Sequence, residues 1–117
     1  MAKRGDTIKP WLSGRVDCRE KRFIQVGNTL MLSETFQCLS PGSKYLYFCM
    51  ALESAGRSYF TFPLGAAKKY GIRGSSLRRH INELEQKGFI VRHSMKNLRQ
   101  PNDYNFSYGW KDVDSRR

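Results

Sequence analysis

The apolar residues after Ser40 recur at the spacing of a helix face. Tyr45, Phe48, Cys49 and Leu52 stand at positions i, i+3, i+4 and i+7. Ser40 offers a hydroxyl to the free backbone N–H groups of a helix start, and a proline suits the first helical position that follows. Gly56 is placed to end the helix in a left-handed conformation. The pattern predicts a first long helix that begins at Ser40.

A strand and two further helices are predicted after this helix. Tyr59–Phe62 alternates as a half-buried strand does, and Pro63 opens a second helix that runs to Tyr70. Gly71 then gives the turn, with Ile72 as a core contact beneath it. The third helix is predicted over 76–87, capped by Gly74 or Ser75. Its apolar residues form a single inward stripe, Leu77, Ile81 and Leu84.

A β-hairpin and three flanking segments complete the predicted α+β organisation. Phe89–His93 and Tyr104–Trp110 alternate like two paired strands, joined by a long basic connection. Residues 1–22 form a basic flexible arm, with Trp11 and Leu12 as its anchors on the body. Residues 23–39 give a short strand at Phe23–Val26 and a helical turn from Ser33, which pack on the body or dimerise. The main domain spans 40–111, and a charged tail spans 112–117.

The predicted order strand, helix, turn, helix, strand resembles that of winged helix-turn-helix proteins. The segment LRRHINELEQKGFI, residues 77–90, resembles the recognition helix and first wing strand of winged helix-turn-helix DNA-binding proteins. Ala67, Gly71 and Leu77 stand at the spacing of that family's small helix-contact residue, turn glycine and buried third-helix residue. The chain also resembles, more diffusely, small plasmid, phage and bacterial regulators and replication-initiator domains. The resemblance covers about residues 40–110 and implies a three-helix core with a C-terminal hairpin wing.

The net charge of the chain indicates what kind of partner it binds. The 117 residues carry 21 Lys and Arg against 10 Asp and Glu, a net charge of +11. Such a surplus favours a polyanion, either a nucleic acid or an anionic membrane surface. No run approaches the roughly 18 apolar residues of a membrane helix, and the first residues lack the apolar segment of a secretory signal. We therefore expect a cytoplasmic protein without a membrane partner.

The remaining chemistry indicates binding rather than catalysis. Cys18, Cys38 and Cys49 are odd in number and widely spaced, which predicts reduced thiols. With His80 and His93 they lack the spacing of a metal site. No phosphate-binding loop, metalloprotease motif or partnered nucleophile is present in the sequence. We expect no enzyme activity, no metal and no cofactor, and a single domain leaves no room for a small-molecule effector site.

The resemblance implies that the third helix enters the major groove of double-stranded DNA. The face opposite the apolar stripe carries the candidate base-reading residues Ser75, Ser76, Arg78, Arg79 and Asn82. An Arg can donate two parallel hydrogen bonds to guanine, and an Asn can pair with adenine. In the alternative interpretation, Arg78 and Arg79 pair with Glu83, Glu85 or Glu53 on a solvated surface.

Other cations are candidates for the DNA backbone, where contacts position the protein without reading sequence. Lys68 and Lys69 end the second helix, and Arg73 lies in the turn. The basic wing, residues 92–103, would grip the backbone or the minor groove with Arg92, His93, Lys96, Asn97, Arg99 and Gln100. Lys3, Arg4 and Lys9 form either a minor-groove arm or a solvated tail.

The expected function is binding to double-stranded DNA, as a transcriptional regulator or as a replication accessory of a plasmid or phage. A homodimer is possible through residues 18–39 or through the first helix. Two alternatives stay open. A protein–protein adaptor needs exposed apolar residues on the third helix, and an RNA-binding module needs Tyr104, Phe106, Tyr108 or Trp110 exposed to stack on bases.

Overall fold

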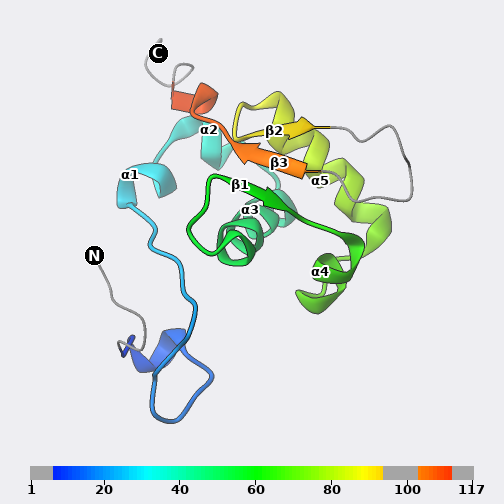
Figure 1. Ribbon diagram of the computed structural model, residues 1–117. Helices are drawn as coiled ribbons and strands as arrows, with labels where there is room; N and C mark the ends of the chain where they lie inside the picture. Colours follow the sequence, from blue (N-terminus) through cyan, green and yellow to red (C-terminus); the bar gives the residue numbers. More distant parts are fainter. Residues whose placement is uncertain (1–6, 94–102, 112–117) are drawn as a thin grey trace.

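The computed structural model describes residues 7–93 and 103–111, which fold as an α+β arrangement of helices around a small antiparallel sheet (Figure 1). The candidate residues Lys3, Arg4, Lys96, Asn97, Arg99 and Gln100 and the tail 112–117 lie outside the described residues. The elements in chain order are η1 (Pro10–Leu12), α1 (Asn28–Met31), α2 (Glu34–Gln37), α3 (Pro41–Ser54), β1 (Tyr59–Thr61), α4 (Leu64–Lys69), α5 (Gly74–Gln86), β2 (Ile90–His93) and β3 (Asp103–Phe106).

Helix α3 lies at the centre of the fold and begins as expected. The Ser40 hydroxyl accepts a hydrogen bond from the Ser43 N–H, and Pro41 occupies the first turn. The expected apolar face is wrong in part. Leu46 and Met50 are fully buried, whereas Tyr45 is 50% exposed and donates its hydroxyl to the Tyr70 carbonyl, 3.0 Å away. Tyr45 therefore covers the junction between α3 and α4 rather than filling the core.

Helices α4 and α5 are joined by the short turn that the sequence predicts. Gly71 has a φ of +77°, and the Ile72 N–H returns to the Ala67 carbonyl at 2.8 Å. Ala67 is fully buried, and its small side chain lets the neighbouring segment of the protein approach α4 closely. Helix α5 starts at Gly74 rather than residue 76, and its N-cap is Arg73 without a side-chain hydrogen bond. Neither Gly74 nor Ser75 is its cap, because the Leu77 N–H already bonds to the Arg73 carbonyl.

Strand β3 is the centre of the sheet, in the order β1-β3-β2, with both pairs antiparallel. The second strand of the expected hairpin ends at Phe106 instead of Trp110, and a helical turn covers 109–111. This turn brings the chain across Gly88, where the Trp110 N–H bonds to the Gly88 carbonyl. The Trp110 ring then stacks on Phe89 at 5.3 Å between centroids. The chain turns there because Trp110 reaches the core over Phe89.

The N-terminal third differs most from expectation. Phe23–Val26 has no regular secondary structure, because none of the described strands pairs with it. Trp11 and Leu12 are 77% and 69% exposed, so they do not anchor the arm on the body. The helical turn from Ser33 is confirmed as α2, and it packs on the body through Phe36 and Leu39, which are 2% and 3% exposed.

The first part of the arm closes on itself as a loop, residues 7–19. Thr7 pairs with Arg19 in an isolated antiparallel bridge, and the Ile8 N–H donates to the Cys18 carbonyl at 2.9 Å. Arg15 pairs with Asp17 inside the loop, at 3.0 Å. In Figure 1 this loop stands away from the helices and the sheet, connected by the extended segment that precedes α1. We call it the arm loop.

Gly42 in α3 leaves room for the His80 ring of α5. A Cβ at this position would lie 2.3 Å from His80 Nε2 and 2.4 Å from Cε1. A glycine inside a helix ordinarily costs roughly 0.5–1 kcal/mol relative to alanine. Gly42→Ala should instead destabilise the protein by about 1–3 kcal/mol, because the buried imidazole must move. Urea unfolding of the two proteins measures this difference.

Gly65 in α4 is the matched control, since a Cβ there meets nothing within 4 Å. Gly65→Ala should leave the stability unchanged or raise it by up to about 1 kcal/mol. If Gly42→Ala is as stable as Gly65→Ala, the imidazole does not rest on this glycine.

Candidate nucleic-acid interface

Helix α5 has one buried face and one exposed face. Ile81 and Leu84 are 5% and 0% exposed, and Leu77 is half-buried against the core, as the apolar stripe predicts. The exposed face forms one wall of an open groove of about 570 Å³. Its lining residues are Ser40, Ser75, Arg78, Arg79, Asn82, Glu83 and Gln86. Four of the expected base-reading residues thus lie together, whereas Ser76 is half-buried and does not line the groove.

A partly buried polar cluster joins α5 to the start of α3. The Glu83 carboxylate accepts hydrogen bonds from the Ser40 N–H and hydroxyl and from the Ser43 hydroxyl. A carboxylate at a helix N-terminus satisfies a free N–H and opposes the positive end of the helix dipole. His80 joins the cluster because its Nδ1 lies 3.1 Å from the Ser43 hydroxyl. We call these four residues the polar lock.

The hydrogen bonds of the polar lock determine the state of His80. The Ser43 hydroxyl has one proton and donates it to Glu83, so its oxygen accepts from His80. This arrangement requires a proton on Nδ1 of the imidazole. Burial lowers the pKa of His80, the nearby Arg79 charge lowers it further, and Glu83 opposes both. Burial raises the pKa of Glu83, but hydrogen bonds from Ser43 and Ser40 outweigh it and hold the pKa below its usual value.

The polar lock does not have the arrangement of a hydrolytic triad. In such a triad the histidine lies between the serine and the acid and accepts the hydroxyl proton. Here Ser43 lies between Glu83 and His80, donates to Glu83, and is 0% exposed. The cluster therefore joins two helices, and no substrate reaches its hydroxyl.

The acids that were candidate partners of Arg78 and Arg79 are engaged elsewhere. Glu83 belongs to the polar lock, and Glu85 pairs with Arg92 at 3.0 Å. Glu53 pairs with Lys69 at 2.8 Å. Within residues 7–93 and 103–111, neither Arg78 nor Arg79 forms a salt bridge, and both side chains are exposed.

Arg92 links the hairpin to α5 instead of facing outward. It is half-buried, and its Nη2 donates to Asn82 Oδ1 at 3.2 Å as well as to Glu85. This bond uses one lone pair of the Asn82 oxygen and leaves the Nδ2 protons and a second lone pair. Asn82 can therefore still meet a partner in the groove, held in orientation by Arg92.

The other candidate contacts to the DNA backbone differ in whether their side chains already have partners within the protein. Lys68 and Arg73 are exposed. Lys69 is held by Glu53 and also lies 5.1 Å from the centre of the Tyr70 ring. His93 Nε2 lies 2.7 Å from Asn105 Oδ1, and its ring stacks on Tyr59. Lys68 and Arg73 are thus the cations best placed to take a phosphate.

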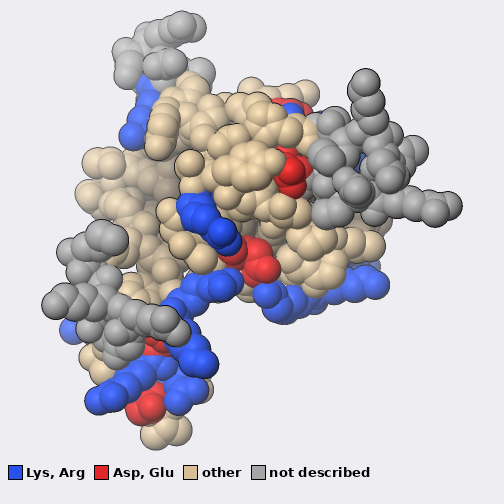
Figure 2. All heavy atoms as spheres, viewed as in Figure 1, with Lys and Arg blue, Asp and Glu red and all other residues tan. Residues whose placement is uncertain are grey.

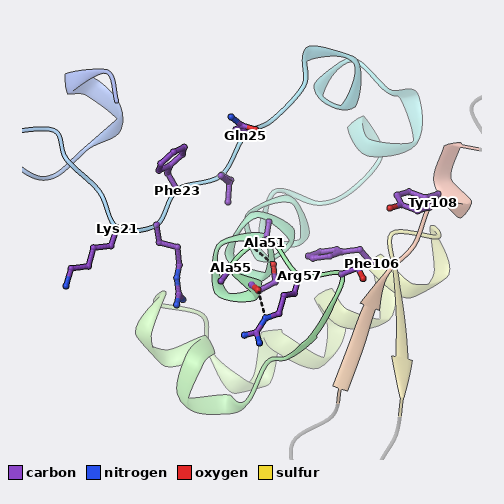
Figure 3. A pocket seen from close by; sticks show the side chains of 13 residues that line it. Lys21, Phe23, Gln25, Ala51, Ala55, Arg57, Phe106 and Tyr108 are labelled. Carbon is purple, nitrogen blue, oxygen red and sulfur yellow. Dashed lines mark hydrogen bonds between the residues drawn. The ribbon is translucent and has the colours of Figure 1, made fainter. Parts of the chain in front are cut away.

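A second open groove lies on another part of the molecule, with a volume of about 930 Å³. It separates the segment Lys21–Gln25 from the C-terminal end of α3 and the end of β3 (Figure 3). In Figure 3 the side chains of Lys21 and Phe23 point away from α3, and Arg57 lies beside that helix end. The Arg57 Nε–H donates to the Ser54 carbonyl at 3.3 Å. Such a cation suits the negative end of the α3 dipole.

Sequence reasoning missed the polar lock, although one signal pointed to it. A glycine in the first turn of a predicted helix is unusual, and Gly42 stands next to Ser43. The close contact with His80 explains this glycine. The Arg92 link was also missed, since it depends on which strand residue faces α5.

Comparisons of the chain with models of protein families, with curated proteins and with solved structures give no significant match. In the part of the chain that the structure describes, no helix is long and apolar enough to cross a membrane. Nor do three His, Cys, Asp or Glu side chains gather there as ligands for a metal ion. Cys18, Cys38 and Cys49 are free thiols, and Cys49 is buried in the core as expected.

The state of His80 predicts a pH dependence of stability. Its pKa in the fold lies below the ordinary 6.5, so its contribution is present above about pH 6.5 and is lost as the pH falls through the lower value. Urea unfolding from about pH 7.5 to about pH 5 should show this loss. In His80→Asn, which keeps a donor for Ser43 but does not titrate, the decline should be shallower. An unchanged decline would place the titrating group elsewhere.

Proposed function

We propose that this protein binds double-stranded DNA as a winged helix-turn-helix protein, with α5 as its recognition helix in the major groove. The hairpin β2–β3 is then the wing. The order α3, β1, α4, turn, α5, β2, β3 and the strand order β1-β3-β2 support this fold type. The fully buried Ala67 and the positive φ of Gly71 fit the close helix-turn-helix packing that such proteins use.

One observation carries the proposal: Arg78 and Arg79 lie exposed on α5 while the neighbouring acids are bound to other groups. Within residues 7–93 and 103–111, neither guanidinium group has an acidic partner in a salt bridge, so both keep donors for a partner molecule. A guanine edge or a phosphate would supply the missing acceptors. Asn82 lies one turn further on the same exposed face and adds a group that suits adenine.

The first turn of α5 supports the same orientation. Ser75 lines the groove with the two arginines, and Arg73 and Gly74 precede it at the helix N-terminus. Free N–H groups and the positive dipole end favour a phosphate at this position. In this arrangement the helix start contacts the backbone, while Arg78, Arg79 and Asn82 reach the base edges.

The two alternative functions receive less support. The exposed residues of α5 are Gly, Ser, Arg, Asn and Gln, without the apolar side chains that a protein adaptor would present. RNA binding through the second hairpin strand needs free aromatic faces. Tyr104 is 1% exposed, and Phe106 packs 4.6 Å from Phe60 between ring centroids. Tyr108 is exposed and would remain for such a role.

We further propose that the protein acts by occupying its site, as a transcriptional regulator or as a replication accessory of a plasmid or phage. The grooves of the described residues are open and border charged side chains. Small-molecule sites, in contrast, are mostly enclosed and apolar. Selection from a pool of random duplexes tests the proposal: enrichment of one motif supports it, and an unenriched pool contradicts specific reading.

Arg79→Ala should lower affinity for the selected duplex by about 1–3 kcal/mol, the discrimination of one good bidentate contact. Affinity for a scrambled duplex should fall much less. Anisotropy titrations of both duplexes measure the two losses. Gln86→Ala is the matched control on the same exposed helix face, one turn beyond Asn82. Equal losses on both duplexes would show that Arg79 contacts a phosphate.

Lys68→Ala should weaken binding to all duplexes alike, and the slope of log affinity against log salt should become shallower by about 0.9. Lys69→Ala should change the slope less, because Lys69 already pairs with Glu53. The same titrations at several salt concentrations give both slopes. Unchanged slopes in Lys68→Ala would remove α4 from the interface.

A further inference from the structure

Several exposed cations lie near the point where the arm joins the body. Lys21, Arg22 and Arg57 line the groove beside the end of α3. Arg22 is close enough for its charge to act on both Glu53 and Tyr70: it adds to the Lys69 hydrogen bond that lowers the pKa of Glu53, and it opposes the burial that raises the pKa of Tyr70. Glu53 is the carboxylate that holds Lys69. Glu53 therefore lies near both Arg22, at the base of the arm, and Lys69, at the end of α4. We call Lys21, Arg22, Arg57, Lys68 and Lys69 the cationic strip.

Figure 2 shows this surface directly, with Lys and Arg side chains gathered from the arm loop along the lower edge of the molecule toward α4. All five members of the strip are exposed. Glu53 forms an ion pair with Lys69, whereas Lys21, Arg22, Arg57 and Lys68 form no salt bridge within residues 7–93 and 103–111, so most of the positive charge is left without an ion-pair partner. Uncompensated like charge destabilises the free protein, and a polyanion relieves that repulsion.

The strip leads toward the proposed DNA face. Lys68 and Lys69 end α4, and Gly71 and Arg73 connect them to the first turn of α5. Lys21, Arg22 and Arg57 lie at the other end of the strip, on a groove that shares no lining residue with the groove along α5. The strip is thus placed to follow the backbone beyond the groove that α5 occupies.

The arm loop gives the strip an ordered extension. The bridge between Thr7 and Arg19 and the Arg15–Asp17 pair hold the loop closed, so it is not a simple tail. Lys9 and Arg19 are exposed on it and add to the same charge. Glu20 is engaged by the Ser13 hydroxyl within the arm.

We propose that the cationic strip and the arm loop bind the phosphate backbone of DNA flanking the site that α5 reads. This inference rests on the proposed function and extends it. It assigns the N-terminal segment a backbone role with a longer footprint, and it assigns no base reading to the arm. The flanking contacts are electrostatic, so they raise affinity for any flanking sequence and disappear at high salt.

The test compares two charge-neutralised variants that each lose two cations. Lys21→Gln/Arg22→Gln removes the arm base, and Lys87→Gln/Lys111→Gln is the control, with two exposed lysines at the C-cap of α5 and beyond β3. Each variant is titrated with a short duplex of about one helical turn that carries the selected motif, and with a long duplex of about three turns. Urea unfolding verifies that both variants are folded.

The wild-type chain should bind the long duplex more tightly than the short one at low salt. Lys21→Gln/Arg22→Gln should lose this advantage, and its salt slope on the long duplex should be shallower by about 2, from two contacts at about 0.9 each. Its affinity for the short duplex should stay close to that of the wild type. The control variant should keep the length advantage.

Three results would overturn the inference alone. Equal behaviour of the two variants would show that only net charge matters. Equal loss on the short and long duplexes would place Lys21 and Arg22 within the core site. Binding of the wild type, but not of Lys21→Gln/Arg22→Gln, to vesicles of phosphatidylcholine and phosphatidylserine, without a length effect on DNA, would reassign the strip to a membrane. Failure of the wild type to bind any duplex would overturn the proposed function as well, which distinguishes the two failures.

Discussion

The contact between Glu83 of α5 and the N-terminus of α3 is the constraint on which the rest of the structure depends. Glu83 accepts the Ser40 N–H and two serine hydroxyls, and His80 rests on Gly42. Because these bonds lie on one side of α5, they fix its rotation about its own axis. Ile81 and Leu84 alone would allow small rotations, since apolar packing is not directional. The polar lock thus decides which residues of α5 face outward.

The charge of the exposed face of α5 depends on which groups the nearby acidic side chains bind. A net charge of +11 does not by itself distinguish a DNA-binding face from a solvated surface. Support for the proposed DNA-binding face comes from three acids that are bound elsewhere. Glu83 binds Ser40 and Ser43, Glu85 binds Arg92, and Glu53 binds Lys69. Arg78 and Arg79 are left without an acid among the described residues, next to Asn82. The same bonds that hold the fold together leave the proposed DNA face positively charged.

The buried face of a helix could be predicted from the sequence where apolar residues were few. Leu77, Ile81 and Leu84 stand alone among polar residues, so the inner face of α5 was readable. The segment 45–52 is apolar almost throughout, so periodicity could not choose its buried face, and Tyr45 was misplaced. The expected strand at Phe23–Val26 failed because a strand needs a partner, which local pattern does not supply. The polar lock could not be predicted from local sequence, because Ser40 and Glu83 are 43 residues apart and come into contact only in the folded chain.

In the proposed complex, the outward face of α5 contacts double-stranded DNA. Mapping backbone amide chemical shifts by NMR during titration with a duplex tests this contact most directly, because every described element reports separately. We expect the largest shifts at residues 74–82, smaller shifts at Lys68 and Arg73, and little change in the buried part of α3 around Leu46. Shifts that leave α5 unaffected, or no shifts at low salt, would contradict the claim.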